Sequence, residues 1–151
     1  MKRLLLLYHS QGGRTAALAE AALAGARREA ATETLPKRAG EATLEDLLAC
    51  HGLLIGTPEN FGTMSGMVKD FFDRTYYPAE GRTVGLPYGL FISAGNDGSG
   101  AAREIGRIAT GYGWKRVAEP VIARGEPTPA DLAACEELGE ALASGIALGI
   151  F

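Results

Sequence analysis

Apolar runs alternate with amphipathic segments along the whole chain. Two runs, residues 3–8 and 86–93, are almost entirely apolar, which is typical of strands that a parallel sheet buries on both faces. Three more stretches are interpreted as strands, and they cover 31–36, 52–55 and 114–123. The first of these, 31–36, is expected at an edge of the sheet because charged residues accompany it. The segments between strands carry apolar residues at helical spacing, and the expected helices cover 16–30, a short stretch after Thr43, 65–75, 101–110 and the residues from 127 onward.

Strand and helix thus alternate five times, without a change of composition, a linker or an internal repeat. This pattern predicts a single domain over residues 1–151. Because crossovers between parallel strands are right-handed, it also predicts an α/β domain of three layers, in which a doubly wound parallel sheet of five strands lies between helices. Residues 76–85, which include Pro78, Gly81 and Arg82, are expected to form a polar connector.

Composition and charge exclude several classes of function. A net charge of −3 and a pI near 5.4 leave no basic stripe, so nucleic acid is not an expected partner. Cys50 and Cys135 have no metal-ligand spacing with each other or with a histidine, and zinc is not expected. The first residues imitate a signal peptide, but their apolar run is too short. Residues 142–151 are also too few to cross a membrane, and we expect a cytoplasmic protein.

Three glycine-rich loops follow predicted strands. The first precedes a helix and contains Ser10, Gln11, Gly12, Gly13, Arg14 and Thr15. Its backbone N–H groups, together with those at the start of the helix, are suited to an anion. The loop lacks the Gly-Lys-Ser/Thr of a Walker loop and the GxGxxG of dinucleotide sites, which favours a phosphomonoester. The alternative is a simple helix cap made by Ser10.

The second and third loops are suited to a flat ligand. Residues 56–66 combine glycines, a proline, an amide and one aromatic ring, so that a planar ligand would lie against Phe61 while Gly62 lets the backbone approach its edge. The alternative is a strand-to-helix turn that binds nothing. Residues 94–100 form the third loop. If the strand order is 2-1-3-4-5, the three loops converge on one crevice at the carboxyl edge of the sheet.

The loops and their flanks form three ordered motifs, YHSQGGRT, GTPENFGTMSGMVKDFFDRT and ISAGNDGSG. Together these resemble the flavodoxin-like superfamily, and most of all its short FMN-dependent NAD(P)H oxidoreductases of the tryptophan-repressor-binding-protein and quinone-reductase kind. The resemblance covers nearly the whole chain and implies a flavodoxin-like fold, FMN as cofactor and NAD(P)H as electron donor. It implies FMN phosphate on residues 10–15, the ring against Thr57, Pro58, Glu59, Asn60, Phe61 and Gly62, and its other edge near Ser93, Ala94, Gly95, Asn96 and Gly98. The chemistry would then belong to the flavin, and no catalytic side chain is expected.

The third loop departs from the pattern of electron-transfer flavodoxins, because residues 94–100 contain no aromatic ring to stack on the flavin. An open ring face would admit a nicotinamide or a quinone-like acceptor, which favours a two-electron oxidoreductase. Two alternatives stay open. One is a one-electron carrier that docks onto redox proteins, with Tyr76 or Tyr77 covering the ring, and the other is a non-catalytic partner-binding module. Asp97 is interpreted either as a charge near the ring or as a helix cap, and related proteins lead us to expect a homodimer.

Overall fold

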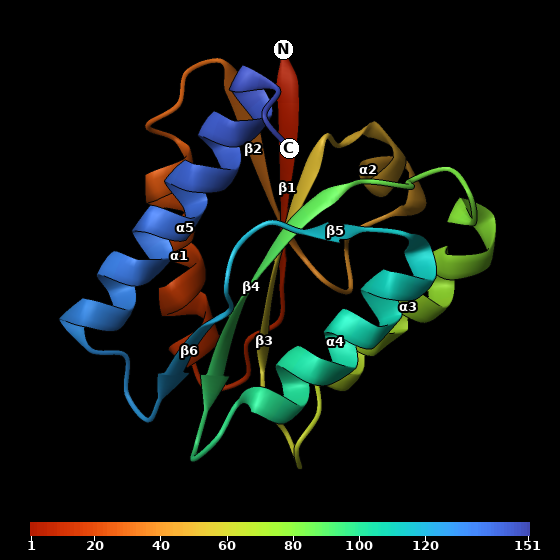
Figure 1. The fold of residues 1–151 in the computed structure, drawn as a ribbon. Coiled ribbons are helices and arrows are strands. Elements are labelled where there is room, and N and C mark those ends of the chain that lie inside the picture. The colour runs from red at the N-terminus through yellow and green to blue at the C-terminus, as the bar shows by residue number, and fades with distance from the viewer.

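The computed structural model describes all 151 residues and has helices on both faces of one parallel sheet (Figure 1). The strands are β1 (Lys2–Tyr8), β2 (Thr32–Arg38), β3 (Gly52–Pro58), β4 (Pro87–Ala94), β5 (Lys115–Arg116) and β6 (Val121–Arg124). The helices are α1 (Arg14–Ala26), α2 (Leu44–Ala49), α3 (Gly66–Ala79), α4 (Ser99–Tyr112) and α5 (Pro129–Leu148). The strand order is β2-β1-β3-β4-β5, with β6 also paired to β4. The predicted three-layer α/β fold and its 2-1-3-4-5 order are therefore confirmed.

Each face of the sheet has its own apolar core. Successive side chains of a strand point to opposite faces, so Leu5 and Leu7 of β1 pack with α2, α3 and α4, whereas Leu4 and Leu6 pack with α1 and α5. Figure 1 shows the same division, with α1 and α5 on one side of the sheet and α3 and α4 on the other. This double burial explains why the centre of β1, Leu4–Leu7, is an unbroken run of leucines.

The predicted fifth strand, residues 114–123, is divided in the structure. β5 ends at Arg116, β6 begins at Val121, and both pair with β4. Pro120 immediately precedes β6, and a proline has no N–H to donate to a neighbouring strand. The chain therefore leaves the sheet between the two pieces, and the sheet has six strand segments instead of five.

The prediction of a connector over residues 76–85 is wrong for residues 76–79. There α3 continues to Ala79 and contains Pro78. Tyr76 packs edge-on against Tyr112, with ring centroids 5.1 Å apart. Ala79 is fully buried in the core. Tertiary packing thus holds a last helical turn that the local composition does not indicate.

Several boundaries also differ near the loops. β3 continues to Pro58 and takes the first residues of the predicted second loop, and α4 begins at Ser99, inside the predicted third loop. α1 ends at Ala26 and not at residue 30, since the chain must turn back to start β2 at Thr32 opposite Lys2. The loops at the carboxyl edge are therefore short. None of the helices combines the length and the apolar character that a membrane crossing requires.

Candidate functional site

The three loops meet at the carboxyl edge of the sheet, where β1, β3 and β4 are neighbours (Figure 1). A cavity of about 410 Å³ opens between them. It is lined by the predicted site residues Gln11, Gly12, Arg14, Thr15, Pro58, Glu59, Ser93, Ala94 and Gly95, and by Glu126, which the sequence patterns do not single out. The other predicted residues lie in or beside the same loops without lining the cavity, namely Ser10, Gly13, Thr57, Asn60, Phe61, Gly62, Asn96 and Gly98.

The start of α1 is an open anion site. Gly13 is its N-cap, with a φ of 97° in the left-handed region that favours glycine, and no side chain bonds to this cap. Ser10 Oγ accepts a hydrogen bond from the N–H of Ala16 at 3.1 Å, so the cap that was the alternative to an anion site is present but takes only one N–H group of the first turn. The N–H groups of residues 11–15 have no acceptor within the chain, and a Cβ on Gly12 or Gly13 would meet only open space. The donors fit a phosphate group.

The start of α4 is closed by Glu59. Its Oε1 accepts from the N–H of Gly98 at 2.8 Å, and its Oε2 accepts from the N–H of Ala101 at 3.0 Å. Glu59 is expected from the sequence to contact a cofactor, yet its carboxylate already has two backbone partners. Of the two helices with a glycine N-cap, α1 leaves the N–H groups of residues 11–15 free, whereas at the start of α4 only the N–H of Gly100 has no acceptor.

The remaining helices at this edge are capped by their own side chains. Thr43 and Thr128 form capping boxes at the starts of α2 and α5, and Ser65 Oγ accepts from an N–H of the first turn of α3. These caps leave no comparable donor set elsewhere along the edge. An anionic group is thus directed to α1.

Two side-chain hydrogen bonds join the loops across the cavity. The hydroxyls of Thr15 and Ser93 lie 2.7 Å apart in a buried position, which connects α1 to the end of β4. Asn60 Nδ2 donates to Gln11 Oε1 at 3.0 Å and connects the first loop to the second. All four residues belong to the predicted set, and the structure brings them together in pairs.

Glu126 is the lining residue that the sequence patterns miss. It follows β6, next to β4 in the sheet, and its Oε1 lies 3.1 Å from Arg14 Nε. Both side chains are largely exposed. Its position directly after a strand beside β4 could have pointed to Glu126 from the sequence, but no glycine cluster marks this loop. Glu126 competes with any bound anion for the charge of Arg14.

The tip of the second loop is a tight turn that carries an exposed ring. The N–H of Asn60 donates to the carbonyl of Thr63 at 2.9 Å, and the reverse bond is 3.1 Å long. Phe61 and Gly62 both have positive φ, 51° and 78°, as in a type I′ turn. The Phe61 side chain is fully exposed, and it lies outside the cavity lining. Its contact with a ring stays a prediction.

Thr57 stabilises the second loop through its buried side chain. It is completely buried, accepts from the N–H of Ser65 at 3.0 Å, and donates to the carbonyl of Pro58 at 2.8 Å. Both bonds are internal to the loop. Thr57 therefore supports the loop between β3 and α3.

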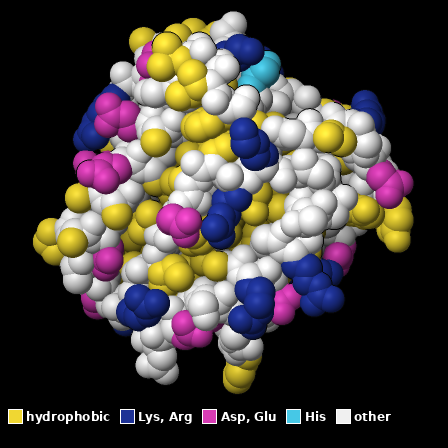
Figure 2. Space-filling model, in the orientation of Figure 1, with side chains coloured by type: hydrophobic (Ala, Val, Ile, Leu, Met, Phe, Trp, Pro, Cys, Tyr) yellow, Lys and Arg dark blue, Asp and Glu magenta, His cyan; other side chains and the backbone are white.

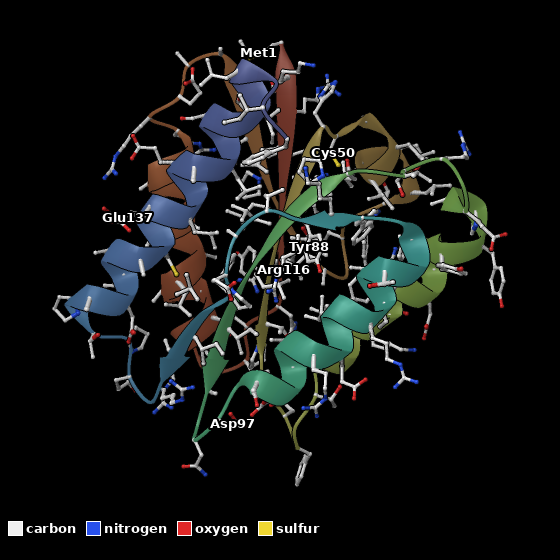
Figure 3. The ribbon with its side chains drawn as sticks, in the orientation of Figure 1. Met1, Cys50, Tyr88, Asp97, Arg116 and Glu137 are labelled. Atoms are coloured by element: carbon white, nitrogen blue, oxygen red, sulfur yellow. The ribbon has the colours of Figure 1, made fainter.

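Asp97 serves the start of α4. Figure 3 shows it at the end of the molecule opposite Cys50. Its carboxylate accepts from the hydroxyl of Ser99 at 2.6 Å and from the N–H of Ser99 at 3.3 Å. The hydroxyl bond is the main cause that lowers the pKa of Asp97. The structure thus supports the interpretation of Asp97 as a residue that holds the helix start.

Tyr76 and Tyr77 lie near the far end of α3. They stand ten and eleven residues from Gly66, a distance of about 15 Å along the helix. Tyr76 packs against Tyr77 and Tyr112, and Tyr77 is exposed. Within one chain, neither ring covers the cavity.

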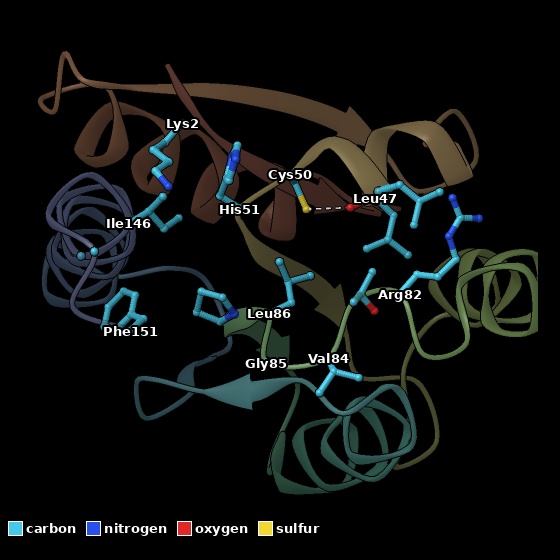
Figure 4. Close-up of a pocket in the computed structure, with 15 residues that line it drawn as sticks. Lys2, Leu47, Cys50, His51, Arg82, Val84, Gly85, Leu86, Ile146 and Phe151 are labelled. Carbon is cyan, nitrogen blue, oxygen red and sulfur yellow. Dashed lines mark hydrogen bonds between the residues drawn. The ribbon is translucent and has the colours of Figure 1, made fainter.

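A second cavity, of about 330 Å³, lies at the opposite edge of the sheet (Figure 4). Its lining includes Lys2, Cys50, His51 and Phe151. The thiol of Cys50 donates to the carbonyl of Leu47, and burial raises the pKa of this thiol to about 12. A thiol that stays protonated at neutral pH is a poor nucleophile. The strands place this cavity about 20 Å from the loops.

Comparisons with known proteins bear on the family and the fold of the chain. The sequence pattern of the family described as "NADPH-dependent FMN reductase" matches residues 14–113. A flavodoxin of Aquifex aeolicus is 32% identical, with 98% of this chain and 89% of that protein covered. An NAD(P)H dehydrogenase (quinone) of Acidithiobacillus ferrooxidans is 35% identical, with 66% of this chain and 60% of that enzyme covered. The present chain therefore spans about three fifths of the length of that enzyme.

Solved structures bear on the fold alone. A WrbA-like flavodoxin from Agrobacterium tumefaciens superimposes with a TM-score of 0.80 at 21% identity, covering 97% of this chain and 98% of that one. The strand order of the sheet agrees with this fold, and the sequence match over residues 14–113 gives the family. The chain belongs to the NADPH-dependent FMN reductase family and has a flavodoxin-like fold.

Proposed function

We propose that FMN binds in the cavity at the carboxyl edge, with its phosphate on the free N–H groups of residues 11–15. The observation that carries this proposal is the contrast between the two glycine-capped helices. Glu59 occupies the start of α4, whereas the start of α1 is open and has no acid in its first turn. Backbone donors at a helix N-terminus favour a doubly charged phosphate.

The ring would lie between the second and third loops. Pro58 and Glu59 line one side of the cavity, and Ser93, Ala94 and Gly95 line the other. The N–H groups of Phe61 and Gly62, which have no acceptor within the chain, would bond to the polar edge of the ring. Bound FMN supplies hydride acceptance and electron transfer, and the chain's own residues bind and orient it.

The proposed electron acceptor is a small quinone-like molecule. Residues 94–100 carry no aromatic side chain, and neither Tyr76 nor Tyr77 reaches the cavity within one chain. One face of the ring is therefore left accessible to small reactants. The quinone-directed name of the Acidithiobacillus relative supports the same class of acceptor.

The test is a titration of FMN-free protein with FMN and with riboflavin, followed by flavin fluorescence. Riboflavin lacks the phosphate but keeps the ring. FMN should bind at least about tenfold more tightly, since charge-assisted bonds to the free amides are lost with riboflavin. Equal affinities would contradict the phosphate site. Anaerobic NADH or NADPH should then bleach the flavin absorbance.

A one-electron carrier is the second candidate, supported by the likeness to the Aquifex flavodoxin over nearly the whole chain. It predicts a flavin that ignores both nicotinamides and is reduced by dithionite in two separate one-electron steps. The same FMN-loaded sample, treated first with NADH or NADPH and then with dithionite, distinguishes the carrier from the oxidoreductase. The carrier would then dock onto a redox protein.

We also propose a homodimer and a cytoplasmic location. Phe61 and Met67 before and at the start of α3, and Tyr77 near the end of the helix, are exposed apolar side chains, and a second copy would cover some of them. Cys50 and Cys135 are free thiols, which suits a reducing compartment. Sedimentation at several concentrations tests the dimer, and fractionation of cells tests the location.

A further inference from the structure

Glu59 bridges two loops that are distant in sequence. Its backbone N–H, directly after β3, donates to the carbonyl of Ser93 at 2.8 Å. Its carboxylate accepts from Gly98 and Ala101 at the start of α4. One residue therefore holds the second loop both to the end of β4 and to the helix that follows the third loop.

The carboxylate replaces a local cap. Gly98, the N-cap of α4, has no side chain, and Asp97 bonds only to Ser99. A helix N-terminus carries a partial positive charge, and charged acceptors form the stronger hydrogen bonds to it. Without Glu59, the N–H groups of Gly98 and Ala101 would lack their protein acceptor.

The close approach of the two loops is a second, independent observation. A Cβ added to Gly100 would overlap the carbonyl of Gly62 and lie 3.2 Å from Glu59 Oε2. The first turn of α4 thus rests directly on the turn at residues 60–63. Any change in how Glu59 holds α4 would shift the third loop relative to the second.

We propose that Glu59 is a positioning residue that sets the width of the slot for the flavin ring, which is the part of the cavity between the second and third loops. In this proposal Glu59 is not a ligand of FMN. This inference rests on the proposed FMN site. The carboxylate acts through the α4 backbone, so the amides it holds, and not the flavin, are its immediate partners.

The first experiment removes the carboxylate and supplies a substitute. Glu59→Ala should raise the dissociation constant for FMN about tenfold, since two charge-assisted bonds that fix the slot are lost. Added acetate should restore most of the affinity by occupying the vacated amides, and it should leave the wild-type affinity unchanged. Glu104→Gln is the matched control, because Glu104 is on the next turn of α4 and makes no hydrogen bond or ion pair.

The second experiment needs no flavin. In the ¹H–¹⁵N spectrum of FMN-free protein, Glu59→Gln should shift the amide protons of Gly98 and Ala101 upfield, while Glu104→Gln leaves both in place. This variant keeps the size of the side chain and so preserves the fold. The readout stays valid if wild-type protein fails to bind FMN, which would overturn the proposed function and leave the contact itself confirmed.

Two results would overturn the positioning role. Unchanged Gly98 and Ala101 shifts in Glu59→Gln would show that the carboxylate does not hold α4. Shifted amides together with a loss of FMN affinity in Glu59→Ala that acetate does not reverse would show that Glu59 acts on the flavin directly.

Discussion

At the residue scale, the cavity has few charges, and those present are paired. Arg14 lies against Glu126, and Glu59 lies against the start of α4. Figure 2 shows cationic and anionic side chains interspersed over one face of the molecule, without a patch of one sign. Recognition of an anion therefore depends on backbone N–H groups and on one arginine.

The Arg14–Glu126 pair makes a testable prediction. Glu126→Gln should tighten FMN binding about twofold to fivefold, because an exposed ion pair is weak and its loss frees Arg14 for the phosphate. Titration of FMN-free protein measures the change. Glu119→Gln is the control, since Glu119 forms a similar exposed pair with Arg116. Weaker binding in Glu126→Gln would show that Glu126 supports the site.

At the scale of elements, two glycines allow α1 and α5 to pack backbone against backbone. A Cβ on Gly25 of α1 would overlap the carbonyl of Glu136, and one on Gly139 of α5 would overlap the carbonyl of Ala22. Glycine is an unfavourable residue inside a helix. In the sequence, Gly25 is only a weak position in a helical segment. The structure shows that it is needed for close approach.

Gly139→Ala should therefore destabilise the fold by about 2–3 kcal/mol, because the added methyl pushes the two helices apart. Gly106→Ala in α4 is the control, since the nearest atom to its Cβ would be Tyr88 Oη at 3.9 Å. That substitution should stabilise by up to about 1 kcal/mol through helix propensity. Urea unfolding of both variants measures the difference, and equal effects would contradict the tight packing.

At the scale of the whole molecule, the two cores that cover the sheet bury several groups that ionise at high pH. Burial raises the pKa of Cys50 and Cys135 from 9.0 to about 12 and that of Tyr112 from 10.0 to about 12. Between these values the folded chain keeps protons that the unfolded chain releases. The contribution of these groups to the free energy of unfolding is therefore fully present below pH 9. It declines as the pH rises toward 12.

Urea unfolding at a series of pH values from 8 upward should show this decline, with a shallower slope for Cys135→Ala than for wild type. The substitution removes one of the groups that release a proton on unfolding. Its overall loss of stability from the vacated volume does not affect the slope. Identical slopes would show that Cys135 ionises equally in both states.

Much of the fold and part of the site could be predicted from the sequence. Unbroken apolar runs such as Leu4–Leu7 marked the buried strands, and alternation with helices implied the parallel sheet. The strand order was confirmed, and the lining of the cavity comes almost entirely from the three glycine loops. Local patterns suffice here because burial on two faces and tight turns impose composition directly.

Only the tertiary structure decided which atoms meet. The role of Glu59 depends on amides about forty residues away, the pairing of Glu126 depends on the position of β6 beside β4, and the length of α3 depends on Tyr112. None of these contacts leaves a local pattern, because each joins segments that are distant in the chain. The sequence by itself determined the layers and the loops, and long-range packing determined which helix start remains open to an anion.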